Sequence, residues 1–568
     1  MNMRHKKHFL LLVFIIVIAS TTIFGGWIAN ETQTAKPDYY FQIEKNIALF
    51  GKIYEEITKR YVEVIDPEKF MKAGIDGMLR TLDPYTIYIE HEGEGSFDLK
   101  LLTTGKYGGV GMRIAKREGW PTVVEPPFEG TPAARAGIRE GDKIIEIDGN
   151  STKDLTITET AQALRGEIGT PVNIQIRRYG VETPLSYRLI RAEIKISDIA
   201  YSGFVDDKIG YIRLSAFTRM ASSQLRDSIA VLKNQGMEAL ILDLRSNPGG
   251  LLESAVEVAE NFISEGKLIV SKRGRFSTSD KDYYSRKQPI WPDQPLIILV
   301  NGYSASASEI VAGAIQDHDR GIIVGSQTFG KGLVQTVIPV SRDGSSLKIT
   351  SEMYYLPTGR LIQKPDFIRS KNVLWGESAQ QDSLQKEKFF STASNRQVKG
   401  NGGITPDIMV EHEKISPIIA HLIMKSMFFN YALEYASKHA ELGRDFEISD
   451  SIVADFKKFL EEKNFSYKTQ SENQIDELEK TIKQEQYYEA ALPCFEQLKN
   501  TVLSAKANDF ENNLEEIKRN LKSEIAAKLW GTARKYEYEL QWDKDVRKAV
   551  ELFSDQERYL SFLAPAAK

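Results

Sequence analysis

The sequence predicts an α+β multidomain protein built around a layered α/β core. Two short, almost unbroken apolar runs, at residues 238–244 and 295–300, are each followed by a Gly/Ser-rich turn and an apolar-periodic helix. Such runs are typical of strands that helices cover on both faces. A glycine-punctuated, strand-rich stretch precedes this core, and a long stretch rich in Glu, Lys, Gln and Leu follows it. The 568 residues correspond to three or four domains at about 150 residues each.

Composition excludes several classes of function. Lys and Arg total 74 and Asp and Glu total 78, so the formal net charge is −4. This balance argues against a general nucleic-acid-binding protein, whose surface would be strongly basic. Hydrophobic residues make up 42% of the chain, which is enough for packed cores and excludes a mainly disordered protein. The one cysteine, Cys494, cannot form an intrachain disulfide, and cysteine-based zinc or iron–sulfur sites are also excluded.

Residues 1–30 predict a segment for export. A basic cluster at residues 4–8 precedes an apolar run over residues 9–29. At about 1.5 Å per residue this run is long enough to cross the ~30 Å hydrocarbon core of a bilayer. In a cleaved signal peptide the apolar part would end near Ala19, whereas a transmembrane anchor would use the whole run. The length favours the anchor, and both interpretations place the rest of the chain outside the cytoplasm, in the cell envelope or the periplasm.

Two helices are expected in an N-terminal helical region, residues 37–100. In the first, apolar residues recur at three- and four-residue spacing, which predicts one buried face. These residues are Ile43, Ile47, Phe50, Ile53 and Ile57. The second helix is predicted over residues 67–82, where Asp83-Pro84 ends it.

Residues 101–192 predict one small β-rich domain. Short strands alternate with glycine turns, and the Asp148-Gly149 pair predicts a hairpin. A helix is expected around residues 157–165 and a strand over residues 172–177.

Residues 193–410 form the predicted α/β core, and residues 411–568 a C-terminal all-helical domain. Only Pro493 lies between Pro417 and Pro565, which favours long helices. We expect their charged faces to be solvated. The sequence does not decide between self-association and the binding of an adaptor through these helices.

Three loops of the core carry the candidate chemistry. The first, residues 243–250, joins a buried strand to a helix predicted over residues 251–262. Its glycines let backbone N–H groups approach a ligand, and a helix N-terminus favours a negative oxygen. A plain turn with Asn247 as the helix N-cap explains the same residues equally well.

The second loop, residues 301–309, lies between a strand that ends at Val300 and a helix predicted over residues 310–316. Ser306 and Glu309 fit a capping box, which requires no catalysis. A strand–turn–helix elbow is also where acyl-transfer enzymes hold a nucleophilic serine.

The third loop, residues 328–335, opens a strand in which Lys331, Leu333 and Gln335 would share one face. Such a lysine is ordinarily a solvated strand end. A serine nucleophile nevertheless needs a base, and His318 and Lys331 are the two candidates. To act near pH 7–8, a lysine pKa must fall by about 2–3 units, which burial can achieve. Gln335 could then orient the amine towards Ser306.

Taken in order, these motifs resemble those of the carboxyl-terminal processing proteases, also called tail-specific proteases, over about residues 43–410. The motifs are GGVG (108–111), DLRSNPGG (243–250), SASASE (304–309), TFGKGLVQ (328–335), YYLPTGRLIQ (354–363) and GGITPD (402–407). The resemblance implies that Ser306 is the nucleophile, Lys331 the general base and Gln335 its orienting partner. It also implies an oxyanion hole of backbone N–H groups, for which we nominate Gly250 and Ala307, while the choice between Gly249 and Gly250 stays open. No metal or organic cofactor is implied.

The unit at residues 101–192 resembles the PDZ domain of this family, which captures a peptide C-terminus by adding it as a strand to a sheet edge. The residues that match its binding loop are Tyr107, Gly108, Gly109, Val110 and Gly111, followed by Met112. Val110 and Met112 would line the pocket for the last side chain of the peptide.

The resemblance therefore implies a serine endopeptidase that cleaves exported or envelope proteins with accessible C-termini. The alternative is a binding protein that holds a peptide or another ligand on the same fold without hydrolysis. A third hypothesis is an acyl-thioester enzyme. The binding protein would be expected to lack Ser306 or Lys331, and both are present. The strand-rich unit and the export segment argue against the thioester enzyme.

Overall fold

The computed structural model describes residues 37–91, 93–364, 388–485 and 487–564, which form two compact units that divide after Arg80. The predicted export segment lies outside these residues. Within them, no helix combines the length and apolarity that crossing a bilayer requires.

The first unit contains helices α2 (Pro37–Arg60) and α3 (Pro67–Leu79). Tyr54 stacks on Phe70, with ring centroids 5.5 Å apart. Both helices were expected, but the burial predicted for one face of α2 is wrong in this unit, since Ile47 is 67% and Ile53 50% exposed. Within the described part of this unit the other helix, α3, has 13 residues against the 24 of α2, so it is too short to cover the whole face.

The second unit contains a β-rich part, called here the β unit, which corresponds to the domain predicted over residues 101–192 and continues to the end of β9 at Lys195. Its main sheet has the strand order β3-β4-β5-β7-β8, and β2 pairs with β9 in a separate ribbon. The predicted hairpin is confirmed, because Ile147 pairs with Asn150 across Asp148-Gly149. The elements are β2 (Lys106–Gly109), β3 (Ile114–Arg117), β4 (Trp120–Val123), α5 (Pro132–Arg135), β5 (Lys143–Ile147), β6 (Asn150–Ser151), α6 (Ile157–Leu164), β7 (Pro171–Arg177), β8 (Leu185–Ile190) and β9 (Ala192–Lys195).

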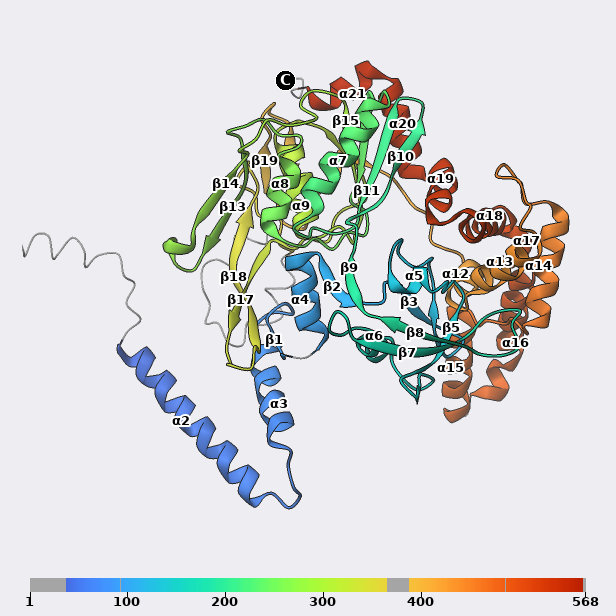
Figure 1. Cartoon of the computed structure of the whole chain (residues 1–568), viewed down its shortest axis with the longest axis horizontal. Helices are drawn as coiled ribbons and strands as arrows, with labels where there is room; N and C mark the ends of the chain where they lie inside the picture. The colour runs from blue at the N-terminus through green and yellow to red at the C-terminus, as the bar shows by residue number, and fades with distance from the viewer. Residues whose placement is uncertain (1–36, 92, 365–387, 486, 565–568) are drawn as a thin grey trace, which may run out of the picture. The chain divides into compact units, whose positions relative to one another are not determined.

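The α/β core contains two large sheets (Figure 1) and a two-stranded ribbon formed by β19 and β20. The larger has the order β10-β11-β12-β15-β16-β21, parallel from β11 onward. The second contains β1, β13, β14, β17 and β18. The elements are β1 (Ile87–Ile89), α4 (Glu94–Thr104), β10 (Ile199–Asp206), β11 (Ile209–Leu214), α7 (Ala221–Asn234), β12 (Ala239–Asp243), α8 (Leu252–Ala259), β13 (Leu268–Gly274), β14 (Lys281–Tyr284), β15 (Leu296–Val300), α9 (Ala307–Asp317), β16 (Ile322–Gly325), β17 (Leu333–Pro339), β18 (Ser346–Tyr355), β19 (Phe389–Ser391), β20 (Gln397–Lys399) and β21 (Ile408–Met409).

Successive side chains of a buried strand point to opposite faces of the sheet, and this explains why these strands are apolar throughout. Leu240 and Leu242 pack into a cluster with α7, α8 and α9 on one face of the large sheet. Ile241, between them, points to the other face and packs with residues from the last helices of the chain. Both faces are thus covered, as the unbroken apolar runs predicted.

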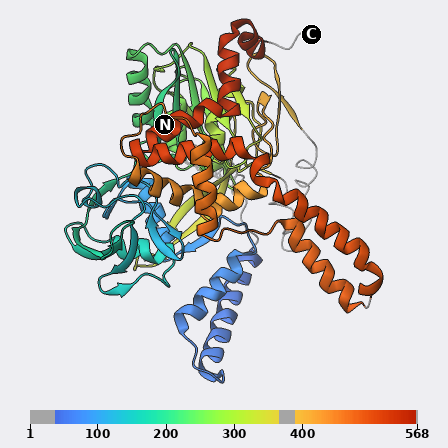
Figure 2. The same cartoon turned by 90° about the vertical axis from the view of Figure 1, so that its right-hand side faces the viewer.

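Ten helices follow within the described part of the chain after residue 411 (Figure 2). They are α12 (Pro417–Met424), α13 (Met427–Lys438), α14 (Asp450–Glu462), α15 (Gln470–Gln484), α16 (Tyr488–Ala507), α17 (Asp509–Asn512), α18 (Leu514–Trp530), α19 (Thr532–Trp542), α20 (Lys544–Ser554) and α21 (Gln556–Leu563). Helices α12, α13, α14 and α18 enclose a core of their own, and α15 and α16 pack as a hairpin.

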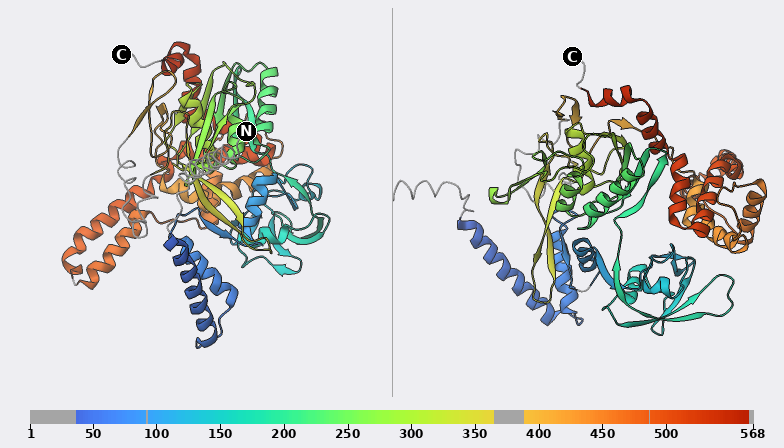
Figure 3. Two further views of the ribbon diagram at one scale, coloured as in Figure 1. Left: turned by 90° about the vertical axis from the view of Figure 1, so that its left-hand side faces the viewer. Right: turned by 45° about the horizontal axis from the view of Figure 1, so that its top comes forward.

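The last helices belong structurally to the α/β core. Helices α20 and α21 lie on the face of the large sheet opposite α7 and α8 (Figure 3). Their residues Leu552 and Tyr559 are buried in the cluster on that face. The Tyr559 hydroxyl accepts from the Leu296 N–H at 2.9 Å and donates to the Leu296 carbonyl at 3.1 Å. Arg245 pairs with Asp543 at 2.8 Å and with Asp545 at 2.7 Å. The predicted all-helical region therefore also supplies one layer of the α/β core.

Candidate active site

The three motif loops meet at one edge of the large sheet. They follow β12, β15 and β16, which are parallel, so their carboxyl ends lie side by side. Ala305 N–H donates to the Asn247 carbonyl at 3.1 Å, and Phe329 N–H donates to the Ser304 carbonyl at 3.0 Å. This edge is where open α/β sheets bind their ligands.

Ser306 differs from its two neighbouring serines. Ser304 and Ser308 are buried, and their hydroxyls donate to the carbonyl oxygens of Leu244 at 2.8 Å and Asn247 at 2.9 Å. Ser306 is only partly buried and lies directly before α9 with φ 56° and ψ −113°. A non-glycine residue with positive φ is strained and persists only where its surroundings hold it.

Glu309 joins the serine loop to the lysine loop. Its buried carboxylate accepts from the backbone N–H groups of Ser306 at 2.8 Å, Gly330 at 2.7 Å and Lys331 at 2.9 Å. The Thr328 hydroxyl donates to it at 2.5 Å. Burial raises the pKa of Glu309 to about 6, although these hydrogen bonds oppose the rise. The sequence indicated only a helix cap at Glu309, because residue spacing does not reveal that the carboxylate also contacts the lysine loop, residues 328–335.

Lys331 is not the solvated strand end that such a lysine usually is. Its Nζ lies 4.3 Å from the centroid of the Tyr85 ring. Burial lowers the pKa of Lys331 to about 8, and the charge of Lys348 adds to this, while Asp83 and Glu309 act in the opposite direction. A substantial fraction of the amine is therefore neutral near pH 8.

Lys331, Leu333 and Gln335, which the sequence predicts on one strand face, all line the same cavity. Lys331 precedes β17, and the register of β17 with β18 shifts between Val334 and Gln335. The extra residue at this shift, Ser351, lies on β18, so the alternation of side chains along β17 continues through Gln335.

Gln335 lines the same cavity as Ser306 and Lys331. Its amide donates to the Thr350 hydroxyl at 3.2 Å, and this hydroxyl donates to Asp83 at 3.1 Å. No hydrogen bond joins Gln335 to Lys331 among the described residues.

Tyr354 also connects the two loops, and the sequence did not single it out by itself. Its buried hydroxyl lies within hydrogen-bonding distance of the carbonyl oxygens of Ser306, at 3.2 Å, and of Lys331. The motif at residues 354–363 contained this tyrosine but gave no sign of where its hydroxyl would lie.

The glycine loop approaches Ser306 closely. A Cβ on Gly249, whose φ is 98°, would lie 2.6 Å from the Ala305 carbonyl and 2.9 Å from Ser306 Cβ. The Gly249 N–H donates to Asn247 Oδ1 at 2.9 Å. The N–H groups of Gly250 and Ala307 donate to no acceptor in the described parts of the chain.

Asn247, considered as a helix cap, and His318, considered as the base, do not have these roles in the structure. Asn247 is not the cap of α8, since Leu251 holds that position, while the Asn247 amide donates to the Leu214 carbonyl at 2.8 Å. His318 caps the far end of α9 from Ser306, and its Nε2 lies 2.6 Å from the Leu268 carbonyl. His318 is therefore out of reach of Ser306.

The cavity at this site has a volume of about 560 Å³. Ser306, Lys331 and Gln335 line it together with Gly250 and apolar side chains such as Leu252 and Ile310. We call it the serine cavity.

A second cavity, of about 330 Å³, lies at the β unit and is called here the β-unit groove. Tyr107, Val110, Gly111 and Met112 line it, together with residues of α6. Gly108 and Gly109 were also expected there but do not line it; like Tyr107 they pair with β9 in the ribbon, and they have no side chain to reach the groove. The backbone N–H groups of Gly111 and Met112 donate to no acceptor among the residues described.

Helix α4 borders both cavities. Phe97 and Leu101 line the β-unit groove, Leu99 and Leu102 line the serine cavity, and Asp98 lines both. In Figure 1, α4 lies between β2 and the β17–β18 pair. One helix thus separates the two cavities.

Four family models match the chain. The model "Peptidase family S41" matches residues 208–369, and "PDZ domain" matches residues 123–178. The model "Probable PDZ-protease, C-terminal helical domain" matches residues 418–553, and "Activating protease CtpB N-terminal domain" matches residues 26–93. The β unit is therefore a PDZ domain, and the fold class that the sequence predicted is confirmed.

Curated relatives point to the same family. The chain is 40% identical over 332 residues to a carboxy-terminal-processing protease of Bartonella bacilliformis, which covers 57% of this chain and 75% of the relative. It is 31% identical over 368 residues to the carboxy-terminal processing protease CtpA of Bacillus subtilis, over 64% of this chain and 76% of that protein. A solved photosystem II D1 C-terminal processing protease matches with 24% identity and a TM-score of 0.33, over 64% of this chain and 92% of that one. The chain belongs to the carboxy-terminal processing proteases.

Proposed function

We propose that this protein is a serine endopeptidase in which Ser306 is the nucleophile and Lys331 the general base. One observation carries the proposal. Among the described residues, Ser306 is the serine of its loop whose hydroxyl donates to no backbone carbonyl, and it shares a cavity with a lysine whose pKa is lowered to about 8. A hydroxyl is a weak nucleophile until a neighbouring base removes its proton.

The reaction follows from these groups. Neutral Lys331 Nζ takes the proton from Ser306 Oγ as Oγ bonds to the carbonyl carbon of the substrate, and the carbonyl π electrons move to oxygen. The C–N bond then breaks, and the Lys331 ammonium gives its proton to the leaving amine. Water attacks the acyl-enzyme and loses a proton to Lys331, and the acyl–Oγ bond breaks. That proton returns to Ser306 Oγ. No step needs a metal or an organic cofactor.

Two backbone N–H groups are proposed as the oxyanion hole, those of Gly250 and Ala307. The Gly249 N–H is already engaged by Asn247, which favours Gly250 for this role. Ala307 is the first residue of α9, where N–H groups lack helical partners and the helix end favours negative charge. Donors held in place before the reaction stabilise the developing charge without reorganising.

Gln335 is proposed to position Lys331. Its amide is held by Thr350, and Thr350 by Asp83, so the side chain has a fixed place in the cavity that Lys331 also lines. The structure has no bond between Gln335 and Lys331, and we expect one to form when substrate fills the cavity.

We also propose that the PDZ domain captures the C-terminal tail of the substrate in the β-unit groove. In the described parts of the chain the N–H groups of Gly111 and Met112 donate to no acceptor, so they are available to hold a carboxylate, and Tyr107 and Val110 line the adjoining space. Gly108 and Gly109 would support the loop from the ribbon. Holding the tail raises the local concentration of the neighbouring peptide at Ser306.

The substrates are proposed to be exported or envelope proteins with accessible C-termini. Residues 1–30, as a signal peptide or an anchor, support a position outside the cytoplasm, in the envelope or the periplasm. Fractionation of cells that express the full chain tests this, and recovery of the protein with the cytoplasmic fraction would contradict it.

The test of the chemistry compares the wild type with Ser306→Ala, Lys331→Ala and Lys331→Arg on an unstructured protein substrate with a free C-terminus. Arginine keeps the positive charge but does not lose its proton near neutral pH, so it cannot act as the base. We expect each variant to lose at least 10³-fold in kcat, by analogy with the loss of a nucleophile or a base in other serine peptidases. Equal cleavage by all four proteins would exclude the mechanism, and a wild type that binds the tail without cleaving it would favour the non-catalytic alternative.

A further inference from the structure

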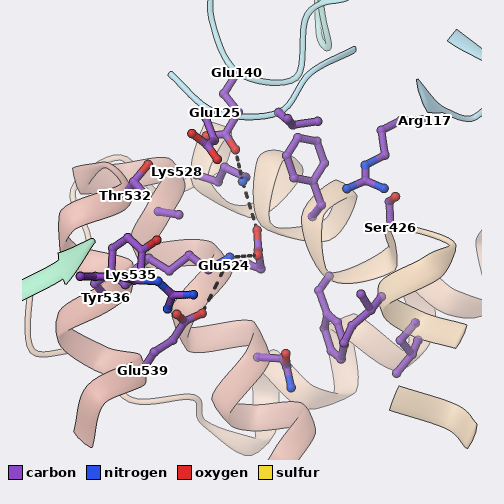
Figure 4. A pocket seen from close by; sticks show the side chains of 18 residues that line it. Arg117, Glu125, Glu140, Ser426, Glu524, Lys528, Thr532, Lys535, Tyr536 and Glu539 are labelled. Atoms are coloured by element: carbon purple, nitrogen blue, oxygen red, sulfur yellow. Dashed lines mark hydrogen bonds and ion pairs between the residues drawn. The ribbon is translucent and has the colours of Figure 1, made fainter. Parts of the chain in front are cut away.

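The PDZ domain contacts the C-terminal helices through a buried ion pair (Figure 4). Lys528 of α18 lies 2.5 Å from Glu140 of the loop between α5 and β5, and their side chains are only 4% and 9% exposed. The two residues are separated by 388 positions in the chain. A buried pair loses its hydration, so either charge without the other is strongly disfavoured.

Further charges hold Lys528 in place. Glu524, one turn earlier in α18, pairs with Lys528 at 3.1 Å and with Lys535 at 2.6 Å. The Lys528 ammonium lies 4.0 Å from the centroid of the Phe429 ring. These residues surround a cavity of about 400 Å³ whose walls also include Glu539 and Tyr536 (Figure 4).

Two other contacts join the same surfaces. Asn430 of α13 donates to Glu118 of the β3–β4 turn at 2.8 Å. Gly141 packs so closely on α13 that a Cβ there would lie 2.6 Å from Leu433 Cδ1. Glu118, Glu140 and Gly141 do not line the β-unit groove, so the helices hold the PDZ domain without occupying that groove.

Docking of the PDZ domain on the C-terminal helices fixes where the β-unit groove lies relative to the serine cavity. Because α4 borders both the β-unit groove and the serine cavity, a docked PDZ domain keeps the two cavities on either side of one helix. A PDZ domain that moved on its linkers would lose this adjacency, and the advantage of tail capture depends on it.

We infer that the C-terminal helices brace the PDZ domain through Glu140 and Lys528, so that a tail held in the β-unit groove lies next to the serine cavity. The inference rests on the proposed function, since it concerns how captured substrates reach Ser306. Glu140 and Lys528 are positioning residues, and neither touches substrate.

The kinetic test uses Glu140→Gln and Lys528→Met in the full chain, with Lys518→Met as the control. Lys518 is in the same helix, but its partner Asp450 is 97% exposed and belongs to the same set of helices. Two substrates share one cleavage sequence, and one has a free apolar C-terminus while the other is amidated. We expect KM for the free tail to rise at least 10-fold in both variants with kcat unchanged, and no change for the amidated substrate or for Lys518→Met. An unchanged KM, or an equal loss on both substrates, would overturn the inference.

A second measurement reports docking directly and does not depend on catalysis. Glu118→Cys and Asn430→Cys are combined in a Cys494→Ser background and treated with a short bifunctional maleimide. We expect efficient cross-linking when Glu140 and Lys528 are intact, and at least a five-fold lower yield when Glu140→Gln is added. Equal yields would overturn the brace, whereas inactivity of the wild type on every peptide would instead remove the proposed function.

The cross-linked protein also tests the position of the groove. If the docked arrangement delivers tails to Ser306, the cross-linked enzyme keeps its preference for the free tail over the amidated one. Loss of that preference on cross-linking would mean that the PDZ domain has to leave the helices during the reaction, and would contradict the inference.

Discussion

Glu309 lies three residues after Ser306, yet its carboxylate accepts a hydrogen bond at 2.9 Å from the backbone N–H of Lys331, in a different loop. The same carboxylate accepts from the Ser306 N–H at 2.8 Å. One buried acid therefore fixes the backbone of both proposed catalytic residues. An activated serine depends on such fixed geometry, because small displacements of a reacting group cost large factors in rate.

Replacing Glu309 by Gln should lower both stability and activity. The amide keeps the shape but presents one acceptor oxygen where the carboxylate presents two, and it loses the charge that strengthens each bond. We expect a loss of about 2–4 kcal/mol in the free energy of unfolding, since hydrogen bonds to charged groups contribute about 1.5–3 kcal/mol each. We also expect kcat to fall about 10²-fold. Denaturant unfolding and peptidase assays measure the two effects, with Glu257→Gln on the exposed side of α8 as the control. Wild-type kcat in the Glu309 variant would contradict the positioning role.

Activity should rise with pH through about 8. The pKa of Lys331 is lowered to about 8, so the neutral amine that acts as base increases tenfold per pH unit below this value and levels off above it. The kcat/KM of the wild type between about pH 6 and 9.5 measures this limb. A rate that does not change with pH over that range would exclude Lys331 as the base.

The lysine should also affect stability in a defined direction. Its pKa is lower in the folded state, from 10.5 to about 8, so the charged form is disfavoured by folding. The free energy of unfolding should therefore gain from Lys331 as pH rises from about 8 towards 10.5, and this gain should be absent in Lys331→Met. Unfolding curves at several pH values compare the two proteins.

Gly249→Ala should inactivate the enzyme. The φ of 98° and the 2.6 Å approach to the Ala305 carbonyl leave no room for a methyl group, so the glycine loop must move away from Ser306. We expect at least a 10²-fold loss of kcat. Gly302→Ala is the matched control on the serine loop, because its nearest atom would be 3.8 Å away, and it should keep wild-type activity. Similar activity in both variants would contradict the proposed geometry.

Leu552→Ala should destabilise the catalytic core although it lies in the C-terminal helices. The side chain is fully buried against the large sheet, and a leucine truncation of this kind costs roughly 2–5 kcal/mol. Leu560→Ala, in α21, removes a side chain that is 54% exposed and should change stability by less than about 0.5 kcal/mol. Thermal inactivation of peptidase activity compares the two. Equal midpoints would mean that the last helices do not stabilise the sheet.

The sequence predicted the elements that depend on local patterns. Apolar runs at residues 238–244 and 295–300 became β12 and β15, covered on both faces, and Asp148-Gly149 became a hairpin turn. The prediction of the first helix was also correct, but the prediction that one of its faces is buried was wrong. Periodicity indicates which residues share a face and not whether another element covers it. The register shift between β17 and β18 was not predicted, because residue spacing within one strand does not reveal an extra residue, here Ser351, in the neighbouring strand.

The sequence by itself determined the family, the order of the domains and the choice of Ser306 and Lys331 as candidates, because ordered motifs and residue types suffice for these. Tertiary structure decided how those candidates are held. Glu309, Tyr354 and the burial that lowers the pKa of Lys331 act through contacts between loops that are distant in the chain. The same holds for α20 and α21, which cover a sheet whose strands β10 to β16 lie more than 200 residues earlier in the chain. Burial and electrostatic environment depend on the folded arrangement as a whole, and no local pattern encodes them.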